Sequence, residues 1–165
     1  MPATFVNNAA IARVSRDLAS RRDDLGRASR VSVTVGIHEE EGAAEEGAAE
    51  EGASTVAQVG LFHEMGTSTI PRRSWLADGI SENEAEITEA LRRVGRAVAQ
   101  KTMRVDTAYA QLGEFIVAKL QARIRANIPP PLSPVTVERK GSSTALIDEG
   151  RLIDSIRSRV REGSS

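Results

Sequence analysis

The side chains best suited to chemistry are His63 and Glu64, which stand in the stretch LFHEMGTSTIPRRSWL from Leu61 to Leu76. A His-Glu pair begins the H-E-x-x-H signature of zinc proteases, in which two histidines on one helix face bind zinc and the glutamate acts on the zinc-bound water. Here Thr67 stands where the second histidine should be, His38 is the only other histidine, and there is no cysteine. We therefore expect no metal site, and we interpret His63 as a residue at a strand end that hydrogen-bonds to neighbouring backbone.

Other catalytic and cofactor signatures are incomplete. Nucleophilic catalysis lacks both a cysteine and a G-x-S-x-G motif. A phosphate-binding loop needs G-x-x-x-x-G-K-S/T, whereas VERKGSSTAL, residues 137–146, lacks the first glycine. Arg139 and Lys140 leave two interpretations open there, an anion site and an ordinary solvated loop. We expect neither an enzyme nor a bound cofactor.

Length and composition favour one soluble domain spanning residues 1–165. A chain of 165 residues is long enough to bury a core, and because only 3% of its residues are aromatic, that core must be built from Ala, Val, Ile and Leu. No apolar run approaches the roughly 18 to 20 residues needed to cross a bilayer, so we expect no membrane partner. The lack of cysteine excludes disulfides and suits a reducing compartment.

Charge is distributed very unevenly. The net charge is −1, but seven glutamates and no basic residue lie between Glu39 and Glu51, and the rest of the chain carries an excess of basic residues. Residues 39–53, here called the acidic segment, repeat EEGAA at a period of five, which matches neither helix nor strand. We expect a flexible arm whose candidate interaction residues are Glu45, Glu46, Glu50 and Glu51.

The first half of the chain predicts a helix followed by two strands. Apolar residues at spacings of three and four over residues 4–24 indicate an amphipathic helix that Gly26 ends, so residues 1–26 form an N-terminal helix. Strict alternation over residues 30–38 predicts a strand with one buried face. A second apolar stretch, residues 54–66, is expected to pair with it, which makes the acidic segment the tip of a long hairpin loop.

The second half predicts two further helices and a terminal strand. Ser74 caps a helix whose apolar positions extend to Val98, and a third helix spans about residues 106–126. Residues 127–150 form a Pro-rich and polar loop, followed by a short helical turn and a basic strand over residues 151–162. The expected fold is α+β, a small antiparallel or mixed sheet packed by two or three amphipathic helices.

The loop between Gly66 and Arg73 is interpreted as a positioning device. Gly66 lets the chain turn, the hydroxyls of residues 67–69 bond to nearby amides, and Pro71 stiffens the approach to the next helix. Trp75 has two possible roles, an intramolecular core residue or an anchor at an interface between subunits. Arg72 and Arg73 are expected to form surface ion pairs, which in a ring could reach a neighbour's carboxylates.

Two stretches of this sequence resemble a known protein family. AQVGLFHEMGTSTIPRRSWLADGI is similar to the hallmark of the tail-completion and head-to-tail joining proteins of tailed bacteriophages, the HK97 gp10-like group, in which an apolar segment leads to H-E-x-G-T, I-P-x-R-P-F-L and a helix. PPPLSPVTVERKGSSTALIDEGRLIDSI is similar to that group's Pro-Leu, R-K-G and D-T-G-x-L stretch. Their order, with helical sequence between them, makes the resemblance specific.

The family pattern can be placed on individual residues. This chain departs from it at Ser74 for proline, Trp75 for phenylalanine and Glu149 for threonine, and the acidic segment has no counterpart in it. The pattern falls on His63, Glu64, Gly66, Thr67, Pro71, Arg73, Trp75, Leu76, Pro131, Leu132, Arg139, Lys140, Gly141, Leu146, Asp148, Gly150 and Leu152.

The resemblance implies a structural virion protein of the phage neck or upper tail, present in the host cytoplasm during assembly. Its partners would be its own copies, in a ring of six, together with the tail tube and the neck or head-completion proteins, and DNA would pass through the lumen without sequence-specific binding. Whether it terminates the tail tube, completes the tail or joins it to the head stays open. The alternative is a basic nucleic-acid-binding protein that uses the arginines Arg151, Arg157, Arg159 and Arg161.

Overall fold

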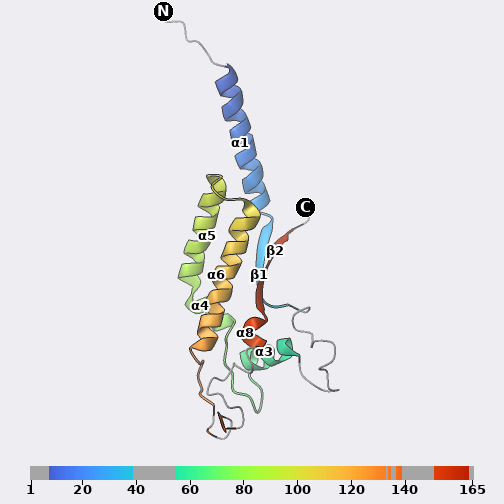
Figure 1. The fold of residues 1–165 in the computed structure, drawn as a ribbon, viewed down its shortest axis with the longest axis vertical. Helices are drawn as coiled ribbons and strands as arrows, with labels where there is room; N and C mark the ends of the chain where they lie inside the picture. Colours follow the sequence, from blue (N-terminus) through green and yellow to red (C-terminus); the bar gives the residue numbers. More distant parts are fainter. Residues whose placement is uncertain (1–7, 39–54, 133, 135–136, 139–150, 164–165) are drawn as a thin grey trace, which may run out of the picture.

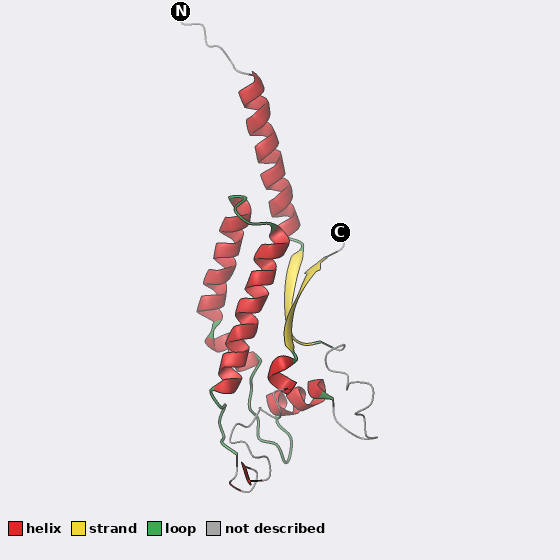
Figure 2. Ribbon diagram, in the orientation of Figure 1, coloured by secondary structure: helices red, strands yellow, loops and turns green. Residues whose placement is uncertain are grey.

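The computed structural model describes residues 8–38, 55–132, 134, 137–138 and 151–163. Over these residues the chain forms six helices and two strands (Figures 1 and 2). The predicted α+β class with a small antiparallel sheet is confirmed. The elements are α1 Asn8–Ala28, β1 Val31–Ile37, α3 Val56–Met65, α4 Ala77–Glu82, α5 Glu84–Ala99, α6 Val105–Arg125, α8 Arg151–Asp154 and β2 Ile156–Glu162.

The strand β1 pairs with β2 from the far end of the chain, not with the segment that follows the acidic segment. The pairing is antiparallel, with Val31 opposite Glu162 and Ile37 opposite Ile156. The prediction of a strand over residues 54–66 is wrong, because Val56–Met65 is the helix α3. The acidic segment therefore links a strand to a helix and is not the tip of a hairpin between paired strands.

The helix α3 is specified by a capping box that begins at Thr55. The hydroxyl of Thr55 accepts a hydrogen bond from the amide of Gln58 at 3.2 Å, and the side chain of Gln58 accepts one from the amide of Thr55 at 3.0 Å. This arrangement satisfies two amides at the helix start. At the other end, Gly66 adopts φ = 77°, which favours glycine, and its amide donates to the carbonyl of Phe62.

The helix α6 lies between the sheet and α5 (Figure 2). Close contact with the sheet depends on Gly113, since a Cβ there would lie 2.6 Å from Cβ of Ser158 on β2. The third predicted helix is confirmed, because α6 agrees within a residue with the expected bounds. The helix predicted to start near Ser74 is divided at Asn83, whose side-chain amide donates to the carbonyl of Gly79, and it forms α4 and α5.

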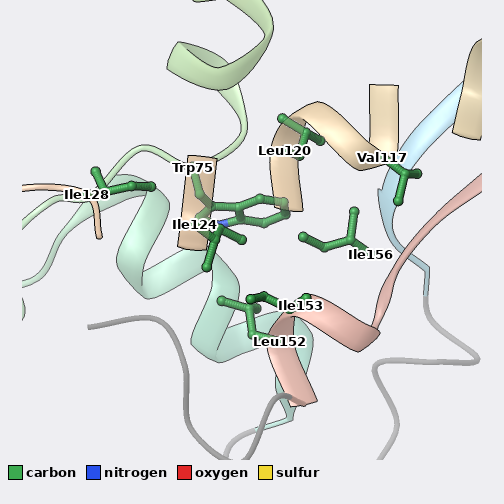
Figure 3. Packing of buried hydrophobic residues seen from close by; sticks show 8 residues of the cluster. All are labelled: Trp75, Val117, Leu120, Ile124, Ile128, Leu152, Ile153 and Ile156. Atoms are coloured by element: carbon green, nitrogen blue, oxygen red, sulfur yellow. The ribbon is translucent and has the colours of Figure 1, made fainter. Parts of the chain in front are cut away.

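The apolar interior has a cluster at each end of α6. The larger cluster surrounds Trp75 and joins residues from α6, α8 and the start of β2 (Figure 3). Its buried members are Trp75, Val117, Leu120, Ile124, Ile128, Leu152, Ile153 and Ile156. The smaller cluster contains Val31, Val98, Val105 and Ala108. The predicted helical turn and basic strand at the C-terminal end are confirmed as α8 and β2.

The N-terminal helix α1 continues to Ala28, so the prediction that Gly26 ends it is wrong. Ala28 packs against the smaller cluster, and its carbonyl accepts a hydrogen bond from the hydroxyl of Tyr109 at 2.9 Å. These tertiary contacts offset the helix propensity cost of roughly 1 kcal/mol for one glycine. The rest of α1 extends past the end of the α5–α6 pair (Figure 1). None of the helices described is long and apolar enough to span a membrane.

Candidate interaction surfaces

The loop from Gly66 to Leu76 connects α3 to α4 and contains three of the predicted interaction residues, Arg72, Arg73 and Trp75. The hydroxyl of Thr67 accepts hydrogen bonds from the amides of Thr69 at 3.3 Å and Ile70 at 2.9 Å. The prediction that loop hydroxyls bond to nearby amides is thus confirmed for Thr67. A Cβ on Gly66 would lie 3.0 Å from the amide nitrogen of Arg72, so the loop closes tightly on itself.

The carboxylate of Glu64 organises the start of α4. It accepts hydrogen bonds from the hydroxyl of Ser74 at 2.7 Å and from the amides of Leu76 at 2.8 Å and Ala77 at 3.1 Å. Amides in the first turn of a helix have no partner within the helix, and a negative charge there is favourable. The N-cap residue of α4 is Leu76 and not the predicted Ser74, but the hydroxyl of Ser74 still accepts a hydrogen bond from the amide of Asp78 at 3.1 Å.

His63 lies in the last turn of α3, so its predicted place at a strand end is wrong. Its carbonyl accepts a hydrogen bond from the amide of Arg73 at 2.7 Å, which ties the end of the loop back to the helix. The described part of the chain holds no group of three or more His, Cys, Asp or Glu side chains that could bind a metal ion.

The neighbouring arginines Arg72 and Arg73 have different surroundings. Arg72 is exposed and forms an ion pair of 3.3 Å with Asp78, as predicted. The prediction of a surface ion pair is wrong for Arg73, which is buried and donates two hydrogen bonds, of 2.9 and 2.6 Å, to the carbonyl of Pro130. Burial lowers the pKa of the Arg73 guanidinium. Arg73 thus fastens the loop to the chain segment that follows α6.

Trp75 is a core residue, the first of its two predicted roles. Its side chain is 4% exposed, and its indole nitrogen donates to the carbonyl of Gly60 at 2.9 Å. Figure 3 shows the ring among residues of α6 and α8. The other predicted interaction residues, Arg139, Lys140, Glu45, Glu46, Glu50 and Glu51, lie outside the described residues.

A row of arginines occupies one face of β2. Alternate residues of a strand point to opposite faces, and Val33 and Ser158 face α6 at Gly113. Arg157, Arg159 and Arg161 therefore point away from α6, next to the polar residues of β1 in the antiparallel register. The alternation of arginines with other residues in β2 was a signal for this face. Sequence analysis named these arginines only for the nucleic-acid-binding alternative.

At the end of the sheet where Val31 pairs with Glu162, Arg27 forms ion pairs with two carboxylates. Its guanidinium lies 2.8 Å from Asp106 and 3.1 Å from Glu162. The hydrogen bonds from Arg27 lower the pKa of the Glu162 carboxyl, and the same hydrogen bonds raise the pKa of Arg27. This cluster ties the end of α1 to α6 and β2.

Large apolar residues also lie on the surface, which sequence reasoning had not predicted. They belong mainly to α1 and α3 and include Val14, Leu18, Leu61 and Met65. The periodicity of α1 was correctly assigned to an apolar face, but a sequence pattern does not indicate whether the same chain covers that face.

Comparisons of the chain with protein-family models, curated proteins and solved structures found no match.

Proposed function

We propose that this chain is a structural virion protein of a tailed phage, and not an enzyme. Copies form a ring at the head-proximal end of the tail, which completes the tail or joins it to the head and surrounds the DNA path. The proposal takes its biological setting, including six copies per ring, from the sequence resemblance described above.

What supports the proposal is the contact between the two sequence stretches that carry the resemblance. They are separated by about fifty residues of mainly helical chain, yet Arg73 of the first donates two hydrogen bonds to Pro130 of the second. Trp75 of the first packs in one cluster with Leu152 and Ile153 of the second. The described parts of the two stretches therefore make one structural unit, as expected for a motif whose role is shape.

The polar groups of the first stretch support the same interpretation. The carboxylate of Glu64 and the guanidinium of Arg73 each make several hydrogen bonds inside the chain. Groups used in this way hold a loop in one conformation. In a ring, heterologous contacts between rigid units close the assembly, and its two axial faces bind different neighbours.

The acidic segment, residues 39–53, has two candidate roles within this proposal. It lines the lumen and repels DNA phosphates, or it binds a basic surface of an adjacent protein; a solubilising loop is the simpler alternative. Replacing its glutamates with glutamine distinguishes these cases, since unchanged assembly and infectivity would reject both active roles.

Electron microscopy of particles made without this protein tests the proposal. Separate heads and tails are expected if the protein joins them, and overlong tubes are expected if it ends tube growth. Supplying the wild-type chain from a plasmid should restore complete particles. Complete and infectious particles without the protein would reject the proposal.

One observation favours the alternative, a basic nucleic-acid-binding protein. Arg157, Arg159 and Arg161 follow one another at every second position on the outer face of a strand, and guanidinium groups bind phosphates well. Binding of duplex DNA should then weaken steeply with salt and be lost on replacing these three arginines with alanine. Replacing Arg13, Arg16 and Arg22 on α1 removes the same charge and is the control.

A further inference from the structure

The helix α1 presents an apolar stripe that the described chain does not cover. Val14 is 58% exposed and Leu18 61% exposed, and Leu25 is also exposed. Their spacings of four and seven residues place them on one side of the helix. The exposure of a single apolar residue is ordinary, but three on one stripe form a surface of the kind found at interfaces.

This stripe differs from the side of α1 that contacts the rest of the chain. The contacting side includes Arg21, which donates to the carbonyl of Ala99 at 2.9 Å, and Ser20, which accepts from Lys101. At about 100° per residue, the stripe lies roughly a quarter turn away from this side. The described residues thus leave the stripe free for another molecule.

The helix α3 has a second exposed apolar stripe. Leu61 is 57% exposed and Met65 69% exposed, with Phe62 exposed between them. The opposite side of α3 also faces apolar residues, since Gly60 is buried against Leu152. Leu61 also lines a cavity of about 380 Å³ between α3 and the end of β1.

We propose that the α1 stripe of one copy packs on the α3 stripe of the next copy. The two stripes lie at opposite ends of the molecule (Figure 1), so the contact joins two different surfaces. A contact of this head-to-tail kind closes a ring where the rotation from copy to copy returns to the start, and gives an open filament where it does not. The inference rests on the proposed function only for that closure; the contact itself follows from the two exposed stripes.

Length and charge also fit a second copy as the occupant. The ten residues of α3 span about 15 Å, comparable to the roughly 16 Å from Val14 to Leu25 along α1. The helix α1 carries five arginines against three aspartates, and Arg22 lies one turn beyond Leu18. The acidic segment immediately precedes α3 in the sequence. The apolar stripe of a basic helix therefore meets an apolar stripe whose helix follows a strongly acidic stretch of sequence.

The test is the mass of the full chain in solution, measured by size-exclusion chromatography with light scattering. The wild-type chain should form an oligomer. The double variants Val14→Glu/Leu18→Glu and Leu61→Glu/Met65→Glu should each be monomeric, with at least a tenfold weaker apparent association. Leu91→Glu on α5 is the matched control, because Leu91 is an exposed leucine outside both stripes, and it should keep the wild-type mass.

Mixing the two double variants distinguishes head-to-tail packing from self-pairing. One variant keeps an intact α3 stripe and the other an intact α1 stripe, so an equimolar mixture should form a one-to-one heterodimer and nothing larger. Circular dichroism melting checks that both fold, and glutamine replaces glutamate at the same positions in any variant that does not.

Three results would overturn the contact: a wild-type chain that stays monomeric, double variants that keep the wild-type mass, or a double variant that still dimerises by itself. If both double variants still form the ring that the wild-type chain forms, this contact is rejected and the proposed function still stands. Complete particles in the absence of the protein would reject the proposed function and leave the contact standing.

Discussion

The Gly66 to Leu76 loop and the helix α1, at opposite ends of the molecule, use their side chains in opposite ways. At the end that contains the Gly66 to Leu76 loop, residues with reactive or charged groups, such as Glu64 and Arg73, make hydrogen bonds within the chain. At the other end, apolar residues of α1 such as Leu18 are exposed to solvent. Residues that resemble an active site belong to the fold, and residues that resemble a core are free to make contacts between molecules.

Energetics explain the first half of this contrast. A polar group taken out of water costs free energy unless it is hydrogen-bonded, and a bonded one holds its neighbours in a single arrangement. The loop end therefore gains a unique conformation from Glu64 and Arg73. The α1 end needs no such device, because its exposed stripe keeps its geometry from the helix itself.

The largest effect on the free energy of unfolding is expected at Trp75, the buried residue at the centre of the larger cluster. Trp75→Ala should lower the free energy of unfolding by about 3–5 kcal/mol, because it leaves a cavity in the larger cluster. Urea denaturation followed by far-UV circular dichroism measures this change. Tryptophan fluorescence cannot be used, because the substitution removes the single tryptophan. Trp75→Phe, which retains a ring but loses the hydrogen bond to Gly60, should cost less. A change below 1 kcal/mol for alanine would contradict the core assignment.

Glu64→Ala should lower the free energy of unfolding by about 2–3 kcal/mol, because three donors lose their charged acceptor. Glu84, an exposed residue in the first turn of α5, is the control, and its replacement should change the value by less than about 0.5 kcal/mol. Equal effects at the two positions would show that the Glu64 cap is unimportant.

A matched pair at Arg72 and Arg73 sharpens the comparison between surface and interior. Arg73→Lys should cost about 1–2 kcal/mol, because lysine cannot reproduce the two-pronged bond to Pro130. Arg72→Lys should cost about 0–0.5 kcal/mol, since exposed ion pairs contribute little. The denaturant midpoints of the two variants measure these costs. A larger loss of stability for Arg72→Lys than for Arg73→Lys would be incompatible with the buried position of Arg73.

The carboxylate of Glu162 should make stability depend on pH. Its pKa is lowered in the folded chain by Arg27, so its contribution is complete above the ordinary value near 4.5 and is lost as the pH falls through the lower folded-state value. The difference in unfolding free energy between wild type and Glu162→Gln should therefore shrink on acidification below pH 4.5. A difference that stays constant across this range would exclude the ion pair as its source.

The smallest effect on folding is expected at the exposed end. Leu18→Ala should change the free energy of unfolding of the monomer by no more than about 0.5 kcal/mol, because its side chain is largely exposed. Leu120→Ala, at a fully buried leucine of α6, should cost about 2–5 kcal/mol in the same assay. A large loss for Leu18 in the monomer would mean that the stripe is covered within the chain.

Elements with long, regular patterns were predictable from sequence. The helix α6 and the alternating strand β1 follow directly from apolar periodicity. The helix α3 was missed because a short, mainly apolar stretch does not by itself distinguish helix from strand. The capping box at Thr55 and Gln58 was the available signal.

Long-range relations were much less predictable. The pairing of β1 with β2 joins residues more than a hundred positions apart, whereas the sequence suggested the nearest apolar neighbour. The roles of Glu64 and Arg73 depend on which groups the fold brings within hydrogen-bond distance. Trp75 was correctly given a core role among its two options, since large apolar rings are usually buried.

Hydrogen–deuterium exchange over a wide range of protein concentration tests the division between fold and assembly most directly. Amides of the Gly66 to Leu76 loop that are hydrogen-bonded, such as Arg73 and Leu76, should be protected equally at every concentration. Protection in α1 around Leu18 and in α3 around Leu61 should rise together as concentration increases. Protection in both helices that does not change with concentration, or a loop that gains protection with them, would contradict the account.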